Sequence, residues 1–144
     1  MEKKFTGKVV IIGGGQIGCD VAHKAVDEGA DVTIIEALDG IGRGYDVFTK
    51  GILTEYLQDK ITLYLNSMVK EVAADSVTFT DQDGVSHSIE ADTVIFCTGQ
   101  KPTGEDLSRK LTDLGVDSYL IGNSSALGRI RNATKSGLDI AYRI

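Results

Sequence analysis

The sequence predicts an α/β protein with a Rossmann-like three-layer fold, built on a parallel sheet and carrying a β-hairpin or meander insertion. Two continuous apolar runs, residues 8–12 and 31–35, are typical of parallel strands buried on both faces. Between them, the glycine-rich loop GGGQIG at residues 13–18 precedes a segment with helical spacing of its apolar residues. Later the apolar period changes from helical to alternating over residues 77–89, which is typical of antiparallel strands.

The first half of the chain alternates predicted strands with predicted helices. The helix after the glycine loop ends at Gly29, because glycine commonly follows the last turn of a helix. A second amphipathic helix over residues 48–57 precedes a third strand at residues 61–65. Helical spacing is carried by Ile17, Val21, Ala22, Ala25 and Val26 in the first helix and by Phe48, Ile52, Leu53, Tyr56 and Leu57 in the second.

The second half begins with a predicted hairpin within residues 68–91. Its turn is DQDG at residues 81–84, with alternating apolar residues on either side. His87 shares a strand face with apolar residues, so a half-buried packing role is favoured over a role as a ligand. The chain then offers a buried strand at 92–99, a helix near 105–114, a strand at 118–122, and a last helix with Ile130, Ala133, Gly137, Leu138 and Ala141 on one face.

The composition argues against several functional classes. The 144 residues are about one domain, and the net charge of −6 disfavours nucleic acid as a partner. No apolar run approaches the roughly 20 residues that span a bilayer, and residues 1–8 lack the pattern of an export signal. We therefore expect a cytoplasmic protein without a membrane partner. Cys19 and Cys97 lie far apart, which predicts two small buried residues rather than a redox dithiol or a zinc site.

The glycine-rich loop has the pattern of a dinucleotide-binding loop. Gly13 ends the strand in a tight turn, Gly15 lets the backbone approach a pyrophosphate, and Gly18 lets the helix pack close to the strand. The phosphates are expected on free N–H groups of Gln16 and Ile17, at the positive end of the helix dipole. The alternative is that the glycines only permit a tight connection between strand and helix.

An acidic residue completes the dinucleotide pattern at the end of the second strand. Glu36 follows TII, about 20 residues after the glycine loop, where it can accept hydrogen bonds from ribose hydroxyls. Because a carboxylate there repels a 2′-phosphate, NAD is favoured over NADP, and Arg43 is the nearest cation that could favour NADP. The alternative for Glu36 is a solvated surface carboxylate. The loop alone leaves NAD and FAD both open, since both carry adenosine diphosphate.

Four segments carry a resemblance to a known family over essentially the whole chain. They are KVVIIGGGQIGCDVA, VTIIEALDGIGRG, DTVIFCTGQKP, and YLIGN followed by a glycine-punctuated helix. They resemble the pyridine-nucleotide-binding region of the pyridine nucleotide-disulphide reductase-like flavoproteins, which bind two dinucleotides. The sequence is most similar to the C-terminal part of enoate reductases and 2,4-dienoyl-CoA reductases, which are old yellow enzyme-like NADH:flavin oxidoreductases. Cys19 and the loop IGRG at residues 41–44 are the more family-specific details.

The resemblance implies a place for this chain in a larger enzyme. Residues 1–97 correspond to an NAD(H)-binding domain that includes the hairpin, and residues 98–144 to the end of an FAD domain, packed with it as one compact unit. In such enzymes hydride passes from NADH to FAD, and electrons reach FMN in an N-terminal barrel through an iron–sulfur cluster to reduce an activated alkene. The implied partners are a nicotinamide dinucleotide and the remainder of the flavoprotein.

The residues expected to bind cofactor follow from the loop and from the resemblance. They are Gly13, Gly14, Gly15, Gln16, Ile17, Gly18, Asp20, Glu36, Ala37, Thr98, Gly99 and Asn123. No catalytic residue and no metal ligand is expected. Thr98 and Gly99 correspond to the return into the FAD domain. Asp20 stands where the family generally has Glu near the nicotinamide, and Asn123 stands where it has the Asp that holds FAD, although asparagine can still hydrogen-bond a ribityl hydroxyl.

Three hypotheses about function remain at this point. The first is the NAD(H)-binding domain of a flavin-dependent oxidoreductase, inactive by itself because the chain offers no second glycine loop, cysteine cluster or acid–base set. The second is a stand-alone, non-catalytic nucleotide-sensing module, and the third is a minimal FAD-binding protein. Exposure of Tyr119, Tyr142 and the apolar face of the last helix would also predict self-association.

Overall fold

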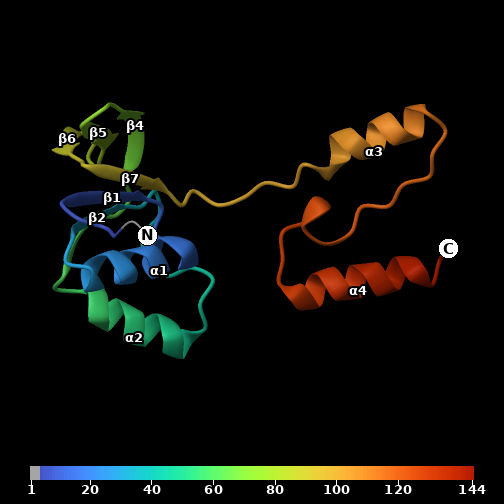
Figure 1. Cartoon of the computed structure of the whole chain (residues 1–144), viewed down its shortest axis with the longest axis horizontal. Helices are drawn as coiled ribbons and strands as arrows, with labels where there is room; N and C mark the ends of the chain where they lie inside the picture. Colours follow the sequence, from blue (N-terminus) through green and yellow to red (C-terminus); the bar gives the residue numbers. More distant parts are fainter. Residues whose placement is uncertain (1–3) are drawn as a thin grey trace. The chain divides into compact units, whose positions relative to one another are not determined.

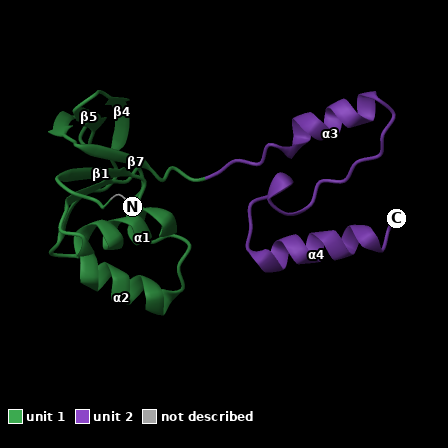
Figure 2. Ribbon diagram, in the orientation of Figure 1, with its two compact units in different colours: residues 1–99 green, residues 100–144 purple. Residues whose placement is uncertain are grey.

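The computed structural model describes residues 4–144 and divides the chain into two compact units, Met1–Gly99 and Gln100–Ile144 (Figure 2). From the sequence we expected a boundary between residues 97 and 98, with the two segments packed as one compact unit, and this packing stays a prediction. Each unit is described by itself below. The prediction that residues 1–8 carry no export signal includes residues 1–3, which lie outside the described residues.

The first unit is built on a four-stranded parallel sheet. β1 (Lys8–Ile12) lies between β2 (Asp31–Ile35) and β7 (Thr93–Phe96), and β3 (Ile61–Tyr64) pairs with the other side of β2. The register pairs Ile12 with Ile35 on one side and with Phe96 on the other. The carboxyl ends of β2, β1 and β7 therefore meet at one edge of the sheet, which is where open α/β sheets bind ligands.

Two helices cover one face of this sheet (Figure 1). α1 (Gln16–Asp27) and α2 (Val47–Leu57) lie on the side to which Val9 and Ile11 project. α2 begins after Asp46, whose carboxylate accepts hydrogen bonds from two backbone N–H groups of the first turn. The buried core on this side consists of Val9, Ile11, Cys19, Ala22, Ala25, Val32, Ile34, Ile41 and Leu57.

A three-stranded antiparallel sheet covers the other face (Figure 1). Its strands are β4 (Met68–Val72), β5 (Ser76–Thr80) and β6 (Ser86–Glu90), with β5 in the centre. The core on this side consists of Val10, Ile12, Ile35, Val77, Phe79 and Ala91. Successive residues of β1 thus point into two different cores, which explains why its sequence is continuously apolar. The predicted α/β three-layer fold, with a parallel sheet and a meander insertion, is confirmed.

The predicted packing histidine, His87, lies in β6 and contacts the turn between β5 and β6. The His87 ring stacks on Phe79 with a centroid distance of 5.2 Å, and His87 Nε2 lies 2.6 Å from the Asp81 carboxylate. Among residues 4–144, no three His, Cys, Asp or Glu side chains are placed to hold a metal ion. The stacking on Phe79 and the half-buried position of His87 agree with the predicted packing role.

The second unit contains α3 (Gly104–Asp113), a single 3-10 turn η1 (Gly122–Ser124) and α4 (Ile130–Ala141). The strand predicted at residues 118–122 is wrong, because the described part of this unit offers it no partner strand. The segment instead runs beside α3, and the Ser118 hydroxyl lies 2.8 Å from that of Ser108.

Exposure in the second unit bears on the predicted self-association. Tyr119 and Tyr142 are 52% and 83% exposed, which is the condition that this prediction required. Self-association itself stays a prediction. No helix in the described part of the chain combines the length and the apolar character needed to cross a membrane.

Candidate functional site

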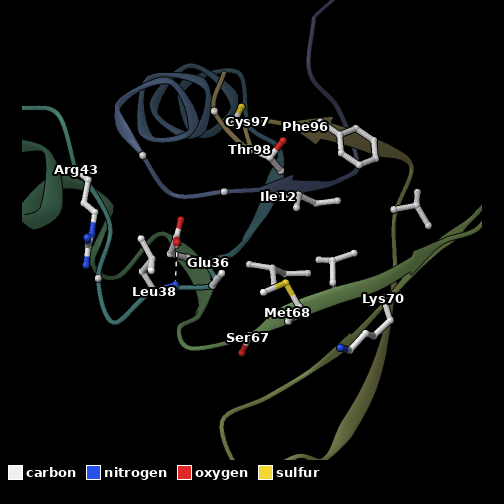
Figure 3. A pocket seen from close by; sticks show the side chains of 18 of the residues that line it. Ile12, Glu36, Leu38, Arg43, Ser67, Met68, Lys70, Phe96, Cys97 and Thr98 are labelled. Atoms are coloured by element: carbon white, nitrogen blue, oxygen red, sulfur yellow. Dashed lines mark hydrogen bonds between the residues drawn. The ribbon is translucent and has the colours of Figure 1, made fainter. Parts of the chain in front are cut away.

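A cleft of about 730 Å³ opens at the edge of the parallel sheet where β2, β1 and β7 end (Figure 3). Its walls come from the glycine loop, the segment after β2, strand β4 and the segment after β7, all in the first unit. The predicted cofactor-binding residues that line it are Gly13, Gly15, Glu36, Ala37, Thr98 and Gly99. The fold thus brings Gly13 and Gly99, which are 86 positions apart in the sequence, to one cleft.

The glycines of the loop fall into two groups when a Cβ is added to each. At Gly13 it would lie 2.5 Å from the Cys97 carbonyl oxygen, and at Gly18 it would lie 1.9 Å from the Gly13 carbonyl oxygen. At Gly14 it would meet Ile41 at 2.5 Å. At Gly15 the nearest atom would be the Arg43 carbonyl oxygen, at 3.8 Å.

Packing inside the chain therefore accounts for three of the four glycines and leaves Gly15 unexplained. Gly15 also has an ordinary extended backbone, with φ of −68°, so no left-handed conformation demands glycine there. Gly15 lines the cleft, and in a dinucleotide loop a Cβ at this position would take space that the pyrophosphate needs.

The N–H groups at the start of α1 differ from the prediction in one respect. The Gln16 N–H is not free, because it donates to the Arg43 carbonyl oxygen at 2.9 Å. Within residues 4–144, the structure gives the Ile17 N–H no acceptor, as expected for the first turn of a helix. Of the two predicted N–H groups, that of Ile17 and not that of Gln16 is therefore available to an anion at this helix end.

Glu36 is buried, with 7% of its surface exposed, so it is not a solvated surface carboxylate. Its Oε2 accepts a hydrogen bond from the Gly14 N–H at 2.5 Å, and its Oε1 accepts one from the Leu38 N–H at 2.8 Å. A carboxylate has about four lone-pair positions, so each oxygen can accept a further hydrogen bond from the cleft. Glu36 thus ties the glycine loop to the segment after β2 and still offers acceptors to a ribose.

The segment after Glu36 closes over the glycine loop. The Gly42 N–H donates to the Gly14 carbonyl oxygen at 2.7 Å. Arg43 lines the cleft, but its guanidinium donates to the Asp39 carboxylate at 3.1 Å, and both side chains are mostly exposed. Lys70 of β4 is a second cation that lines the cleft. The choice between NAD and NADP therefore stays a prediction.

Six of the predicted site residues do not line the cleft. Four of them, Gly14, Gln16, Ile17 and Gly18, belong to the glycine loop itself, and the other two lie elsewhere. Asp20, in the second turn of α1, is exposed, and its carboxylate accepts a hydrogen bond from the Tyr45 hydroxyl. Asn123 belongs to the second unit, where its side-chain oxygen accepts a hydrogen bond from the Gly128 N–H at 3.1 Å.

An apolar wall of the cleft was missed by the sequence reasoning. Leu38, Met68 and Phe96 line the cleft and are 43%, 53% and 63% exposed (Figure 3). Apolar walls with a few placed polar groups are typical of cofactor sites. Phe96 could have been found from its place at the end of a predicted strand. Met68 gave no such signal, because its position depends on how β4 packs beside the parallel sheet.

The two cysteines differ in burial. Cys19 is fully buried, as predicted, and its thiol donates to the Gly14 carbonyl oxygen at 3.3 Å. Cys97 is only half-buried and lines the cleft, so the prediction of full burial is wrong for this residue. Burial raises the pKa of both thiols, which keeps them protonated near neutral pH.

Comparison with known proteins identifies the family. Residues 1–120 match the pyridine nucleotide-disulphide oxidoreductase family. The chain belongs to this family. It is 32% identical to an NADH oxidase of Thermoanaerobacter brockii over 95% of this chain and 21% of the relative. It is 36% identical to the CoA-dependent NAD(P)H sulfur oxidoreductase of Pyrococcus abyssi over 98% of this chain and 31% of that protein.

Two solved structures are similar to this fold. A 2-naphthoyl-CoA reductase in complex with 2-naphthoyl-CoA superposes with a TM-score of 0.75 at 25% identity, over 99% of this chain and 22% of that chain. A thioredoxin reductase of Lactococcus lactis superposes with a TM-score of 0.72 at 18% identity, over 97% of this chain and 52% of that chain, and shows the fold alone.

This member of the pyridine nucleotide-disulphide oxidoreductase family spans about a fifth to a third of the length of the curated relatives above. It corresponds to one domain region of flavin-dependent oxidoreductases that are much longer chains, and the family implies binding of NAD(P)H and FAD. The predicted membership of this family is confirmed. The closer resemblance to enoate reductases is taken up below as part of a proposal.

Proposed function

We propose that this chain binds NADH and forms the NAD(H)-binding part, residues 1–97, of a larger flavin-dependent oxidoreductase. The observation that carries the proposal is Gly15, the one glycine of the loop that the packing of the chain does not require. It lies in the same cleft as the buried Glu36 carboxylate. A glycine that lines a cleft, together with an acidic residue in the same cleft that can bind ribose hydroxyls, is the arrangement of a dinucleotide site.

Each part of the cleft has a role in this proposal. The pyrophosphate lies against Gly15 and accepts a hydrogen bond from the Ile17 N–H, at the positive end of α1. Glu36 accepts hydrogen bonds from the ribose hydroxyls and disfavours the 2′-phosphate of NADPH. Leu38, Met68 and Phe96 supply apolar contacts, and Ala37, Thr98 and Gly99 complete the walls. This chain's residues thus bind and orient the cofactor.

The parent reaction belongs to the same proposal. NADH held here would supply a hydride, and FAD, FMN and an iron–sulfur cluster held by the rest of the parent would carry electrons to an activated alkene such as a 2-enoate or dienoyl thioester. Residues 98–144, with Asn123, would contribute to the FAD side. The resemblance to enoate reductases supports this assignment, as does the similarity to a reductase whose bound molecule is an aromatic acyl-CoA.

Titration of the purified chain with NADH and NADPH, followed by cofactor fluorescence, tests the binding proposal. The chain has no tryptophan, so its own emission interferes little. We expect saturable binding of NADH and weaker binding of NADPH. Glu36→Ala should weaken NADH binding at least about tenfold, since it removes charge-assisted hydrogen bonds to the ribose. Glu55→Ala, an exposed carboxylate of α2, is the matched control.

Two other outcomes would change the proposal. Absence of saturable binding for both nucleotides, or equal NADH affinity of Glu36→Ala and Glu55→Ala, would overturn it. Uptake of FAD with a yellow colour, in place of NADH, would favour the minimal flavoprotein instead. A natural reading frame that extends beyond these residues would favour the larger oxidoreductase over a stand-alone sensing module.

A further inference from the structure

The segment after β2 is hydrogen-bonded to the start of α1 through the backbone N–H and the carbonyl oxygen of Gln16. The Gln16 N–H donates to the Arg43 carbonyl oxygen at 2.9 Å. The Gln16 carbonyl oxygen lies 3.0 Å from the Tyr45 hydroxyl, which also donates to the Asp20 carboxylate. The single hydroxyl proton of Tyr45 therefore lies between two acceptors on successive turns of α1. This is the helix end that carries the Ile17 N–H group.

We propose that Tyr45 is a positioning residue for the dinucleotide: its hydroxyl fixes the start of α1 and the 40–45 segment in the arrangement that NADH binds. The inference rests on the proposed function and adds a residue to it that does not touch the nucleotide. Tyr45 is absent from the walls of the cleft and acts only through Gln16 and Asp20.

The need for such an anchor follows from the composition of the segment. Residues 40–45 read GIGRGY, and Gly42 and Gly44 have φ of +75° and +105°, in the region that favours glycine. A segment so rich in glycine loses much conformational entropy when it is ordered. An anchoring side chain orders the loop during folding. Less of the NADH binding free energy is then offset by ordering the loop.

The protonation state of Tyr45 suits a permanent donor. Burial, together with the hydrogen bond to the Asp20 carboxylate, raises the pKa of the Tyr45 hydroxyl. The hydroxyl therefore keeps its proton well above neutral pH, and the contact persists across the range in which NADH binding is measured.

The same helix offers a matched control at its other end. The Tyr56 hydroxyl donates to the carboxylate of Asp27, the last residue of α1. Tyr56, like Tyr45, is half-buried and follows its acceptor by more than 20 residues. The two tyrosines thus make the same kind of contact with one helix, and only Tyr45 makes it beside the glycine loop.

Tyr45→Phe and Tyr56→Phe, compared in the full chain, test the inference. Each variant keeps its ring and loses its hydroxyl, so we expect similar, small decreases in unfolding temperature. NADH affinity should fall about five- to tenfold in Tyr45→Phe and change less than about twofold in Tyr56→Phe. Amide hydrogen exchange over residues 16–20, without nucleotide, should accelerate in Tyr45→Phe alone, and saturating NADH should restore the protection.

Each contrary outcome is decisive. If the wild-type chain does not bind NADH, the proposed function and this inference fall together. If the wild-type chain binds NADH and both variants match its affinity, or lose affinity equally, only the inference is overturned. If Tyr45→Phe shows no cooperative unfolding transition, the hydroxyl serves the fold as a whole, and a specific positioning role is likewise excluded.

Discussion

The two units of the chain differ in how they bury their apolar residues. In the first unit, the residues of β1 are buried in two cores, one against α1 and α2 and one against the antiparallel sheet. In the second, neither α3 nor α4 has a buried residue, and Leu107 and Ile130 are 63% and 85% exposed. Because burial of apolar surface is the main favourable term in folding, the difference assigns the stability of the chain, as well as the cleft, to the first unit.

Separating the two units should give the largest effect. We expect a chain that ends at Gly99 to keep a cooperative thermal unfolding transition and to bind NADH within about twofold of the full chain, because both cores and the cleft lie in residues 4–99. A peptide of residues 100–144 should unfold without a cooperative transition, because its helices lack a core of their own. Circular dichroism on heating measures both.

Two results would contradict the assignment of the stability to the first unit. A cooperative transition in residues 100–144 alone would show that the second unit has a self-sufficient core. Loss of the transition in residues 1–99 would show that the first unit depends on the second.

A second prediction separates fold from site inside the first unit. Gly14→Ala forces a Cβ against Ile41, and overpacking of this kind costs about 1–3 kcal/mol of unfolding free energy. In Gly15→Ala the new Cβ meets only the Arg43 carbonyl oxygen, at an ordinary van der Waals distance of 3.8 Å, so the substitution should cost at most about 1 kcal/mol, the usual difference at a helix N-cap. NADH affinity should nevertheless fall at least about tenfold in Gly15→Ala, because the new Cβ occupies the pyrophosphate position.

Denaturant unfolding and NADH titration of both alanine variants provide the measurements. If Gly15→Ala bound NADH as tightly as the wild type, the glycine would serve only the connection between strand and helix. The loop would then carry no argument for a nucleotide.

The sequence predicted the parts of the molecule in which local pattern and tertiary packing agree. The strands at residues 8–12 and 31–35 were predicted with the bounds that the structure gives them, because residues buried on both faces leave an unmistakable apolar run. The strand expected at residues 118–122 failed for the opposite reason. Its apolar residues fit a strand, but strand formation needs a partner that the sequence pattern does not guarantee.

The same division holds at the candidate site. The glycine loop and Glu36 are parts of a short-range pattern, so their approach could be predicted from spacing alone. The bond from Gln16 to Arg43 and the contacts of Tyr45 depend on the path of a glycine-rich loop. No periodicity reports that path, because glycine permits many conformations. The prediction that Gln16 offers a free N–H therefore failed, although the prediction for Ile17 agrees with the structure.

The smallest predicted effect concerns the pH dependence of the unfolding free energy. Part of this dependence is expected to come from Asp81, next to the antiparallel sheet of the first unit. The hydrogen bond with His87, followed by those from backbone N–H groups of Val85 and Asp83, lowers the pKa of the Asp81 carboxyl from its ordinary value of 3.8. A lowered pKa in the folded state means that the stabilising contribution is complete above that ordinary value and is lost as the pH falls below it.

Asp81→Asn should therefore lower the unfolding temperature at pH 7 and have little effect near pH 2, where the wild-type carboxyl is also protonated. Asp83→Asn is the matched control, because it removes the same charge from the same turn, and within residues 4–144 the structure gives the Asp83 carboxylate no hydrogen bond. Thermal unfolding of both variants between pH 2 and pH 7 separates the two contributions. Parallel curves for Asp81→Asn and Asp83→Asn would mean that the net charge of the turn matters and that the bond from Asp81 to His87 does not. A larger loss for Asp81→Asn, confined to the higher pH values, would place an acid-sensitive contact on the buried face that Phe79 and His87 share, within the unit that also holds the cleft.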